Sequence, residues 1–525
     1  MRIFSSVLLF SVVVPLVNIS PTAANAGLVP HLVAIQNGLT RSWHTQISVD
    51  NRRGRVAHIT HHVSTKRFFH IHTVTYKRET YVVSDRDLDN NGIPIGSETA
   101  AEMADERIRQ LKRLRRPPTH DVQKLPETTL FVQTNRGVVQ AIDTQTGRTL
   151  WISDVGNRNY LTMAPAASDS CVAALNGSTL YILDRGSGTI KWSRSLMGAP
   201  GAGAAISDEM VFVPMADGTI EGYRVADSGL PTWFFKSAGR SLIPPTITNT
   251  TVSWPTSHGH LYVGSSFEGQ IRYRFEADSI IVAPSTHIGT DRLYFASLDG
   301  DVFALDQPSG EIAWRFSIGD EVSLSPIPIG DGIYVISENN HLYRLDMKNG
   351  QPQWRSGRIK QFLAAGKNRL YCRDTLDNVV ILDIETGIRI GSFNVPGVDY
   401  FLTNLYTDRI FLGTRTGMLQ CLHPSETELP MVHLVIPKKK SQKPAEDQSE
   451  EETKTDGPVA EPRNQPAEET KNPFDNDDDN PFASDDSDTP TNANDEISPP
   501  ADKTENESEN PFEEDEENES NPFEA

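Results

Sequence analysis

The stretch AIDTQTGRTLW, residues 141–151, decides the fold of this chain. In it an apolar run ends at Asp143, a turn passes through Gly147, and Trp151 follows. An aspartate side chain can accept hydrogen bonds from the amides of a turn, and glycine tolerates the positive φ that reverses the chain. Tryptophan carries a large ring that gains from burial. The stretch therefore predicts a strand, a tight turn and an outer strand that buries its tryptophan.

The same skeleton returns at intervals of about 40 residues. ALDQPSGEIAW, residues 304–314, is a clear copy, and Tyr273 takes the place of tryptophan in a worn one. A pattern with a fixed period marks a repeat architecture, so we interpret its residues as structural rather than catalytic. The residues assigned to this structural role are Asp143, Gly147, Trp151, Asp184, Gly188, Trp192, Asp227, Trp233, Asp306, Gly310, Trp314, Asp346, Gly350 and Trp354.

Each period also contains a strand, a polar turn and a second strand, as in RLYFASLDGDVFALD at residues 292–306. The chain has eight such hairpin segments, the first at 129–143 and the last at 409–423. A short apolar run ahead of several hairpins supplies an inner strand, and the tryptophan segment supplies an outer one. Four antiparallel strands per period predict an all-β fold, an eight-bladed β-propeller of four-stranded antiparallel blades over residues 119–437.

Closing such a ring requires a strand from each end of the repeat region. MVHLVIP, residues 431–437, is strand-like and stands where the last blade lacks its outer strand. The inner strand of the first blade must come from before Thr129, and DVQKL at residues 121–125 is the candidate. We therefore expect the ring to close between these two segments.

The A-x-D-x-x-T-G-x-x-x-W pattern resembles the repeat of pyrroloquinoline-quinone-like, or quinoprotein dehydrogenase-like, β-propellers. The resemblance covers residues 122–437. Quinoprotein alcohol dehydrogenases share the repeat, and so does the lipoprotein scaffold of the bacterial outer-membrane β-barrel assembly machine. The enzymes imply a quinone over the channel, a disulfide between adjacent cysteines, and Ca²⁺ near a catalytic aspartate. The scaffolds imply eight blades and a protein-binding face.

The cysteines favour the scaffold over the enzyme. Cys171, Cys372 and Cys421 are far apart, so no adjacent pair can form the disulfide of the enzymes. We expect a non-enzymatic, protein-binding or scaffold propeller without catalytic residues and without pyrroloquinoline quinone. A quinone- or metal-binding propeller enzyme is the alternative. Each cysteine lies in a strand-like apolar run, which favours buried free thiols, and a bridge between Cys372 and Cys421 is the other interpretation.

Residues 1–26 have the anatomy of a secretory signal peptide. Arg2 precedes an apolar run that is shorter than the roughly 20 residues of a spanning helix, and Ala24-Asn25-Ala26 follows. A membrane anchor is the alternative. We expect an exported protein that is periplasmic, associated with the cell envelope or secreted, with no membrane span after the signal is removed.

Residues 27–118 do not follow the repeat and predict a small β-hairpin module with a helix at 97–116. Strands are expected at 40–50 and 55–63, joined as a hairpin by NRRG. Further strands are expected at 68–76 and 79–85. Histidines two or four residues apart fall on one side of a strand, as a metal site would need, although exposed strand histidines are the simpler interpretation. The residues concerned are His58, His62, His70 and His72.

DLDNNGIPIGSE, residues 87–98, resembles a calcium loop of the EF-hand type. Asp87, Asp89, Asn91 and Glu98 occupy its first, third, fifth and twelfth positions, and a helix follows. Ca²⁺ is therefore the one metal that the sequence suggests. An Asp-Asn-Gly turn that caps the helix explains the same residues without a metal.

Residues 438–525 predict a disordered acidic tail. From Glu446 to the end, 29 acidic and 4 basic residues give a net charge of −25, so the remaining chain carries +4 of the total of −21. Asn-Pro-Phe occurs four times, with the aromatic residues Phe474, Phe482, Phe512 and Phe523. Repeated weak sites on one flexible chain favour multivalent docking, and a solubilising tail is the alternative.

Short basic runs such as LKRLRR and KKKSQK are typical of a solvated helix end or a linker. We therefore expect partners among other envelope or secreted proteins and none among nucleic acids. The sequence leaves the oligomeric state open.

Overall fold

The computed structural model describes residues 27–50, 53–77, 79–227, 231, 233–248, 250–267, 270–287, 292–427 and 429–433. The expected signal peptide at 1–26 and the expected tail at 438–525 lie outside these residues. The described residues belong to one compact unit, Met1–Ser441. No helix in the described ranges combines the length and the apolar character that crossing a membrane requires.

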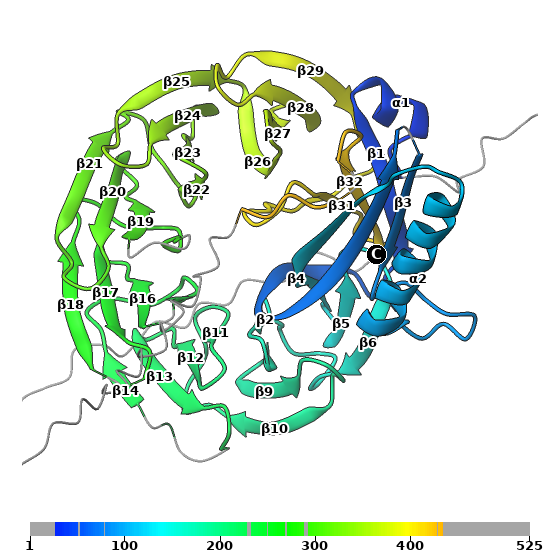
Figure 1. Cartoon of the computed structure of the whole chain (residues 1–525). Helices are drawn as coiled ribbons and strands as arrows, with labels where there is room; N and C mark the ends of the chain where they lie inside the picture. Colours follow the sequence, from blue (N-terminus) through cyan, green and yellow to red (C-terminus); the bar gives the residue numbers. More distant parts are fainter. Residues whose placement is uncertain are drawn as a thin grey trace, which may run out of the picture. The chain divides into compact units, whose positions relative to one another are not determined.

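Antiparallel sheets, most of them four-stranded, follow one another around a ring (Figure 1). This arrangement confirms an all-β fold of mostly four-stranded antiparallel sheets. Three of the four-stranded sheets follow one another along the chain from residue 166. Named from inner to outer strand, they are β7 (Ala166–Ala167), β8 (Cys171–Asn176), β9 (Thr179–Asp184) and β10 (Ile190–Ser195); β11 (Ala205–Ile206), β12 (Met210–Pro214), β13 (Thr219–Arg224) and β14 (Trp233–Lys236); and β15 (Thr246–Ile247), β16 (Thr251–Pro255), β17 (His260–Ser265) and β18 (Ile271–Glu276).

A three-stranded sheet comes next in the ring, and an isolated bridge from Thr286 to Tyr294 stands at its inner side. Its strands are β19 (Arg292–Ala296), β20 (Asp301–Asp306) and β21 (Ile312–Ser317). Two four-stranded sheets follow: β22 (Ile327–Ile329), β23 (Gly332–Ile336), β24 (His341–Asp346) and β25 (Pro352–Gly357); and β26 (Ile359–Ala365), β27 (Arg369–Asp374), β28 (Asn378–Asp383) and β29 (Arg389–Asn394).

The ring closes through a strand from the N-terminal end of the described chain. After the short helix α1 (His31–Gln36), β1 (Leu39–Gln46) pairs with β32 and becomes the outer strand of the last sheet. The other strands of that sheet are β30 (Tyr400–Phe401), β31 (Ile410–Gly413) and β32 (Met418–Pro424). The prediction that residues 431–437 supply this outer strand is therefore wrong. Val432 makes only an isolated bridge to Thr407, because β1 already occupies the edge of β32.

The first sheet takes its inner strand from β2 (Val56–Tyr76), whose residues 56–63 pair with residues 128–134 of β4 (Thr119–Thr134). The prediction that residues 121–125 form this inner strand is wrong, because they belong to β4 itself and pair with the second half of β2. The sheet has the order β3-β2-β4-β5-β6, with β3 (Glu79–Ser84), β5 (Val138–Asp143) and β6 (Thr149–Asp154).

The second half of β2 and the first half of β4 lie beyond the residues that pair with β5 and form, with β3, a sheet extension. Helix α2 (Gly96–Arg113), at the place of the helix expected at 97–116, packs on it in a cluster with Val74 and Val83. The prediction of a separate module at 27–118 is wrong, because β1 and β2 are strands of the ring. The expected hairpin through NRRG does not form either, since β1 pairs with β32 and β2 with β4.

The register of β2 shifts between Val63 and Phe68, and the residues in this irregular stretch bind neighbouring sheets. Asp169, in the turn before β8, accepts hydrogen bonds from the hydroxyl of Ser64 (2.5 Å) and from the backbone N–H of Thr65 (3.0 Å). Burial alone would raise the pKa of Asp169, but the contact with His62 and the hydrogen bonds from the hydroxyls of Ser64 and Thr65 hold it well below its ordinary value. Lys66 reaches one sheet further and pairs with Asp208.

Aromatic side chains of outer strands, most of them tryptophans, fasten several sheets to the next one in the ring. The ring of Trp151 in β6 covers Gly188, which has φ +72°, and its indole N–H donates to the carbonyl of Arg185 (2.7 Å). Trp43 makes the same contact with Gly147 and donates to Thr144 (2.7 Å). Equivalent donors and acceptor carbonyls are Trp192 to Val225, Tyr273 to Gln307, Trp314 to Met347, and Trp354 to Ile384.

The aspartate of the repeat holds the turn that carries this acceptor. Asp184 accepts hydrogen bonds from the backbone N–H groups of Gly186 and Ser187, each at 3.0 Å. Asp227 does not occupy this position. In its sheet Arg224 stands opposite Met210, as Asp184 stands opposite Cys171, so the assignment of Asp227 to the repeat is wrong.

Replacing Gly188 by alanine should destabilise the protein by about 3 kcal/mol. A Cβ atom at Gly188 would lie 2.4 Å from Cε3 of Trp151, and the positive φ adds backbone strain. Urea unfolding measures the effect, and Gly186→Ala in the same turn is the matched control because its Cβ would meet nothing closer than 3.4 Å. Equal stability of the two variants would contradict this account of the contact.

Replacing Trp43 by alanine should cost about 3–5 kcal/mol, the usual cost of truncating a buried tryptophan. Trp43 is only 7% exposed and links the last sheet to the first, so its loss also loosens the closure of the ring. Thermal unfolding of Trp43→Ala should show this loss, while His44→Ala on the exposed side of β1 should unfold as the parent does. A loss below about 1 kcal/mol would mean that β1 is not needed for closure.

Candidate functional site

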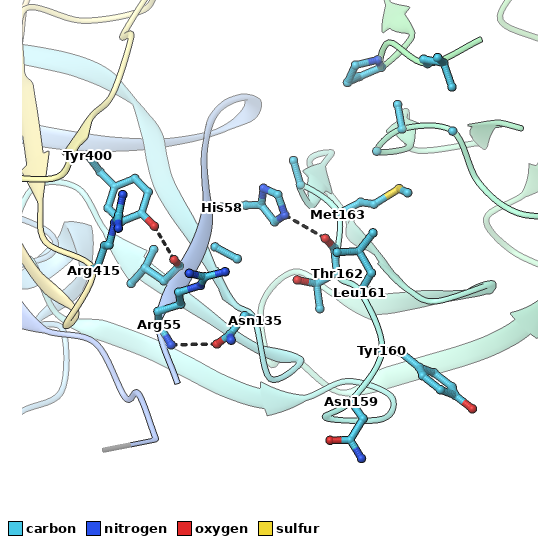
Figure 2. A pocket seen from close by; sticks show the side chains of 18 residues that line it. Arg55, His58, Asn135, Asn159, Tyr160, Leu161, Thr162, Met163, Tyr400 and Arg415 are labelled. Carbon is cyan, nitrogen blue, oxygen red and sulfur yellow. Dashed lines mark hydrogen bonds between the residues drawn. The ribbon is translucent and has the colours of Figure 1, made fainter. Parts of the chain in front are cut away.

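A cavity of about 940 Å³ opens among the inner ends of several sheets (Figure 2). The start of β2 and the loops that lead into β7, β11 and β15 supply most of its lining, and Tyr400 and Arg415 of the last sheet complete it. These loops can approach one another closely because the loop before β11 has glycine at positions 201 and 203. A Cβ at Gly201 would lie 2.1 Å from the carbonyl oxygen of Ser241, and one at Gly203 would lie 2.7 Å from that of Ala164.

One side of the cavity is basic. The backbone of Arg55 is fixed, because its N–H donates to Oδ1 of Asn135 (2.8 Å) and its carbonyl accepts from the N–H of Asn135 (3.0 Å). The exposed guanidinium of Arg55 has no hydrogen bond or ion pair to any described residue. Arg415 lies beside it, 67% exposed and 3.7 Å from Asp399. Arg55 therefore gives this wall a positive charge that no described residue compensates, whereas Arg415 is paired with Asp399.

The opposite side of the cavity is apolar and open. Leu161 is 74% exposed and Leu242 is 52% exposed, although both lie in loops that line the cavity. Figure 2 shows Leu161 and Met163 across the cavity from Arg55. His58 stands between the two sides, and its Nε2 is 3.0 Å from the carbonyl oxygen of Thr162. Exposed apolar groups next to unpaired charge are typical of surfaces that bind other proteins.

Deeper in the ring a second cavity of about 340 Å³ is lined by the inner strands β7, β11 and β15 and by His61. Burial, with a smaller contribution from neighbouring His62, lowers the pKa of His61 to about 3. Its ring packs edge-on against Tyr406 and Phe411, with centroids 5.5 and 5.6 Å apart. Burial also lowers the pKa of His287 in the same lining. Both imidazoles are therefore neutral at pH 7.

Two of the suggested calcium ligands, Asp87 and Asp89, accept hydrogen bonds from nearby backbone N–H groups. Asp89 accepts hydrogen bonds from the backbone N–H groups of Ile93 (2.8 Å) and Asn91 (2.9 Å), and the bond from Ile93 does most to lower the pKa of its carboxyl group. Asp87 accepts a hydrogen bond from the N–H of Ser84. Helix α2 has no side-chain cap, so this turn does not cap it as the alternative proposed.

The histidines suggested as metal ligands in β2 have separate partners instead of a common one. His62 lies 3.2 Å from Asp169, His70 lies 3.5 Å from Asp85, and Nδ1 of His72 lies 3.3 Å from Nε2 of His120. Within the described ranges, no three His, Cys, Asp or Glu side chains gather in a way that could hold a metal ion.

Cys171, Cys372 and Cys421 are all free and buried, in keeping with the favoured interpretation. Burial raises the pKa of the Cys421 thiol to about 12. The tail residues Phe474, Phe482, Phe512 and Phe523 lie outside the described residues.

Trp43 and Arg55 are the residues that the sequence did not reveal. Trp43 precedes every Asp-Gly turn in the chain, so a search for tryptophan after such a turn cannot find it. The only local signal is its place among polar residues in a strand-like segment. Arg55 becomes part of the cavity only because β2 lies at the centre of the ring.

A family model described as "Outer membrane protein assembly factor BamB" matches residues 135–275 and 268–397, which together span half of the chain. The chain belongs to this family. The match confirms the resemblance to pyrroloquinoline-quinone-like propellers and to the outer-membrane assembly scaffold. The sheet extension built from β2, β3, α2 and the first half of β4 lies outside the matched residues.

Curated relatives carry the same description. The BamB protein of Yersinia pestis is 21% identical over 285 residues, which are 50% of this chain and 64% of that protein. The chain thus spans just under two thirds of that relative. The BamB protein of Escherichia coli K12 is 25% identical over 313 residues, 53% of this chain and 79% of the relative. The crystal structure of BamB from Moraxella catarrhalis aligns with a TM-score of 0.48 at 18% identity, covering 56% of this chain and 91% of that one.

The neutral state of His61 predicts how stability depends on pH. The unfolded chain takes up a proton near pH 6.5, whereas the folded chain does so only near pH 3, so stability falls as the pH drops through this window. The free energy of unfolding should therefore fall between pH 7 and pH 5. His61→Phe, which keeps an aromatic ring beside Tyr406, should make this fall smaller by up to about 2 kcal/mol. Urea unfolding at both values measures it. His44→Phe is the control, and an unchanged pH slope in His61→Phe would refute the assignment.

Proposed function

We propose that this protein is an exported, eight-bladed, non-enzymatic propeller that acts as a scaffold in the assembly of outer-membrane proteins. Its membership of the family described as outer membrane protein assembly factor carries the proposal. The relatives in Yersinia pestis and Escherichia coli are named as assembly factors. The antiparallel sheets of the described residues support eight blades if each sheet is taken as one blade, and the hairpins of the sequence indicate the same number.

The geometry of the cavity supports binding of protein segments. Arg55 and Arg415 offer positive charge in the lining, and Leu161 and Leu242 offer exposed apolar surface in the same lining. A partner segment could bury the leucines and neutralise the arginines, whereas a small cofactor would leave much of so open a surface exposed to water. Export rests on the signal-like residues 1–26, and the periplasm or cell envelope is the compartment in which such partners occur.

Quantitative cross-linking in the envelope fraction of the native organism tests this function. The full chain should cross-link to proteins of the outer-membrane assembly machinery, and the double variant Arg55→Glu/Leu242→Ser should lose at least tenfold of this yield. Arg272→Glu/Phe234→Ser, on the exposed outer strands β18 and β14, is the matched control and should retain it.

Two results would overturn the proposal. The first is that no assembly protein is enriched over the control with the full chain. The second is that addition of pyrroloquinoline quinone and Ca²⁺ yields a coloured, substrate-reducible holoprotein, which would establish the enzyme alternative. A chain that ends after Pro437 shows what the tail contributes. Partners that bind the ring should still cross-link to this shortened chain, whereas partners that bind the tail should not.

A further inference from the structure

The sheet extension leaves one strand with a free edge. Residues 119–124 of β4 pair with β2 on one side, while β5 pairs with β4 only from Thr129 to Gln133. All six residues from Thr119 to Lys124 are exposed. Val122, in the middle, is 47% exposed. Nothing in the described part of the chain therefore covers this edge.

An edge of this kind presents backbone groups as well as side chains. In an antiparallel pair, alternate residues direct their N–H and C=O groups away from the neighbouring strand. Six extended residues span about 20 Å, enough for a partner strand of five or six residues. Strands left open in this way are templates for the addition of another strand, and many proteins bind extended peptides by this route.

Basic side chains stand at both ends of the free edge. Arg113 ends helix α2 and Arg115 follows in the short turn that leads to Thr119, the first residue of β4; both are exposed and form no ion pair with a described residue. At the other end, Lys124 lies over the ring of Phe68 at 4.4 Å, and exposed Arg67 follows in the irregular part of β2. Asp121 is the only acidic residue from 119 to 124. The surroundings of this edge therefore favour a partner with negative charge.

The other edge of the extension is less suited to binding an acidic chain. On that side β3 begins with Glu79, and the two nearest arginines are already engaged with it. Arg107 and Arg116 each lie 3.8 Å from the Glu79 carboxylate. An acidic partner beside β3 would compete with Glu79 for the same charges, whereas Arg113 and Arg115 beside β4 are not so engaged.

We propose that residues 119–124 form a docking strand to which a partner protein adds an extended acidic segment as a further strand of the sheet. The backbone ladder supplies affinity that does not depend on sequence, and the basic groups at the two ends select for carboxylates. The site lies outside the residues matched by the family model and does not require the proposed role in outer-membrane assembly.

The test uses the full chain and a synthetic capped octapeptide that alternates Glu with Thr or Val. Two further peptides carry N-methyl groups on the odd-numbered or on the even-numbered amides. Only one of these sets can face β4, so strand addition predicts that one methylated peptide loses at least twentyfold in affinity while the other binds like the parent peptide. Fluorescence anisotropy at 150 mM salt measures the three dissociation constants. Equal binding by both methylated peptides would overturn the proposal, as would no binding of the parent at millimolar concentration.

Two further measurements locate the site and its charge requirement. Hydrogen exchange should slow at residues 119–124 when the parent peptide binds, and protection confined to β3 or to an outer strand of the ring would overturn the assignment.

The double variant Arg113→Gln/Arg115→Gln should weaken binding of the parent peptide at least fivefold. Lys348→Gln/Lys367→Gln, on exposed turns of the ring, is the matched control and should leave it unchanged. Equal affinity for the two double variants would contradict the charge selection. Failure of this peptide test leaves the cross-linking test of the assembly role unaffected, so the two proposals can fail separately.

Discussion

The contact between an indole ring and a glycine of the next sheet is the constraint on which the rest of this structure depends. Trp151 lies flat over Gly188, where a Cβ atom would lie 2.4 Å from the ring, and its N–H binds the carbonyl that the turn presents. The hydrophobic clusters likewise join neighbouring sheets, as where Phe131 and Trp151 pack with Val172 and Leu183. Each sheet thus finds its core in its neighbours, and the ring is stable only when it is closed.

Closure explains why the two ends of the described chain meet. β1 brings Trp43 to the last sheet, and this side chain makes towards Gly147 the contact that other outer strands make around the ring. β2 then enters the centre as the inner strand of the first sheet and places Arg55 and His58 in the cavity. The same segments that close the ring therefore also build the candidate site.

The site combines residues that are distant in sequence. Arg55, Leu242 and Arg415 come from three different sheets or the loops between them, and only the ring brings them to one cavity. The lining joins charged and exposed apolar groups in one open cavity, which is the feature that the proposed binding of protein segments uses. The sheet extension adds a second surface, with a free strand edge in place of a cavity, so one chain offers two chemically different ways to hold a partner.

The sequence by itself determined the repeating part of the fold, because an Asp-Gly turn and its tryptophan are local neighbours about 40 residues from the next copy. The place of Trp151 just after its turn is enough to predict an outer strand with a buried indole ring. Only the tertiary structure decided how the ring closes, since the pairing of β1 with β32 joins residues almost 400 positions apart and leaves no local pattern. For the same reason the sequence could not show that β2 is one strand of the ring, that Asp227 lies outside the repeat position, or that Arg55 lines a cavity. Strand order and the proximity of loops are properties of the closed ring.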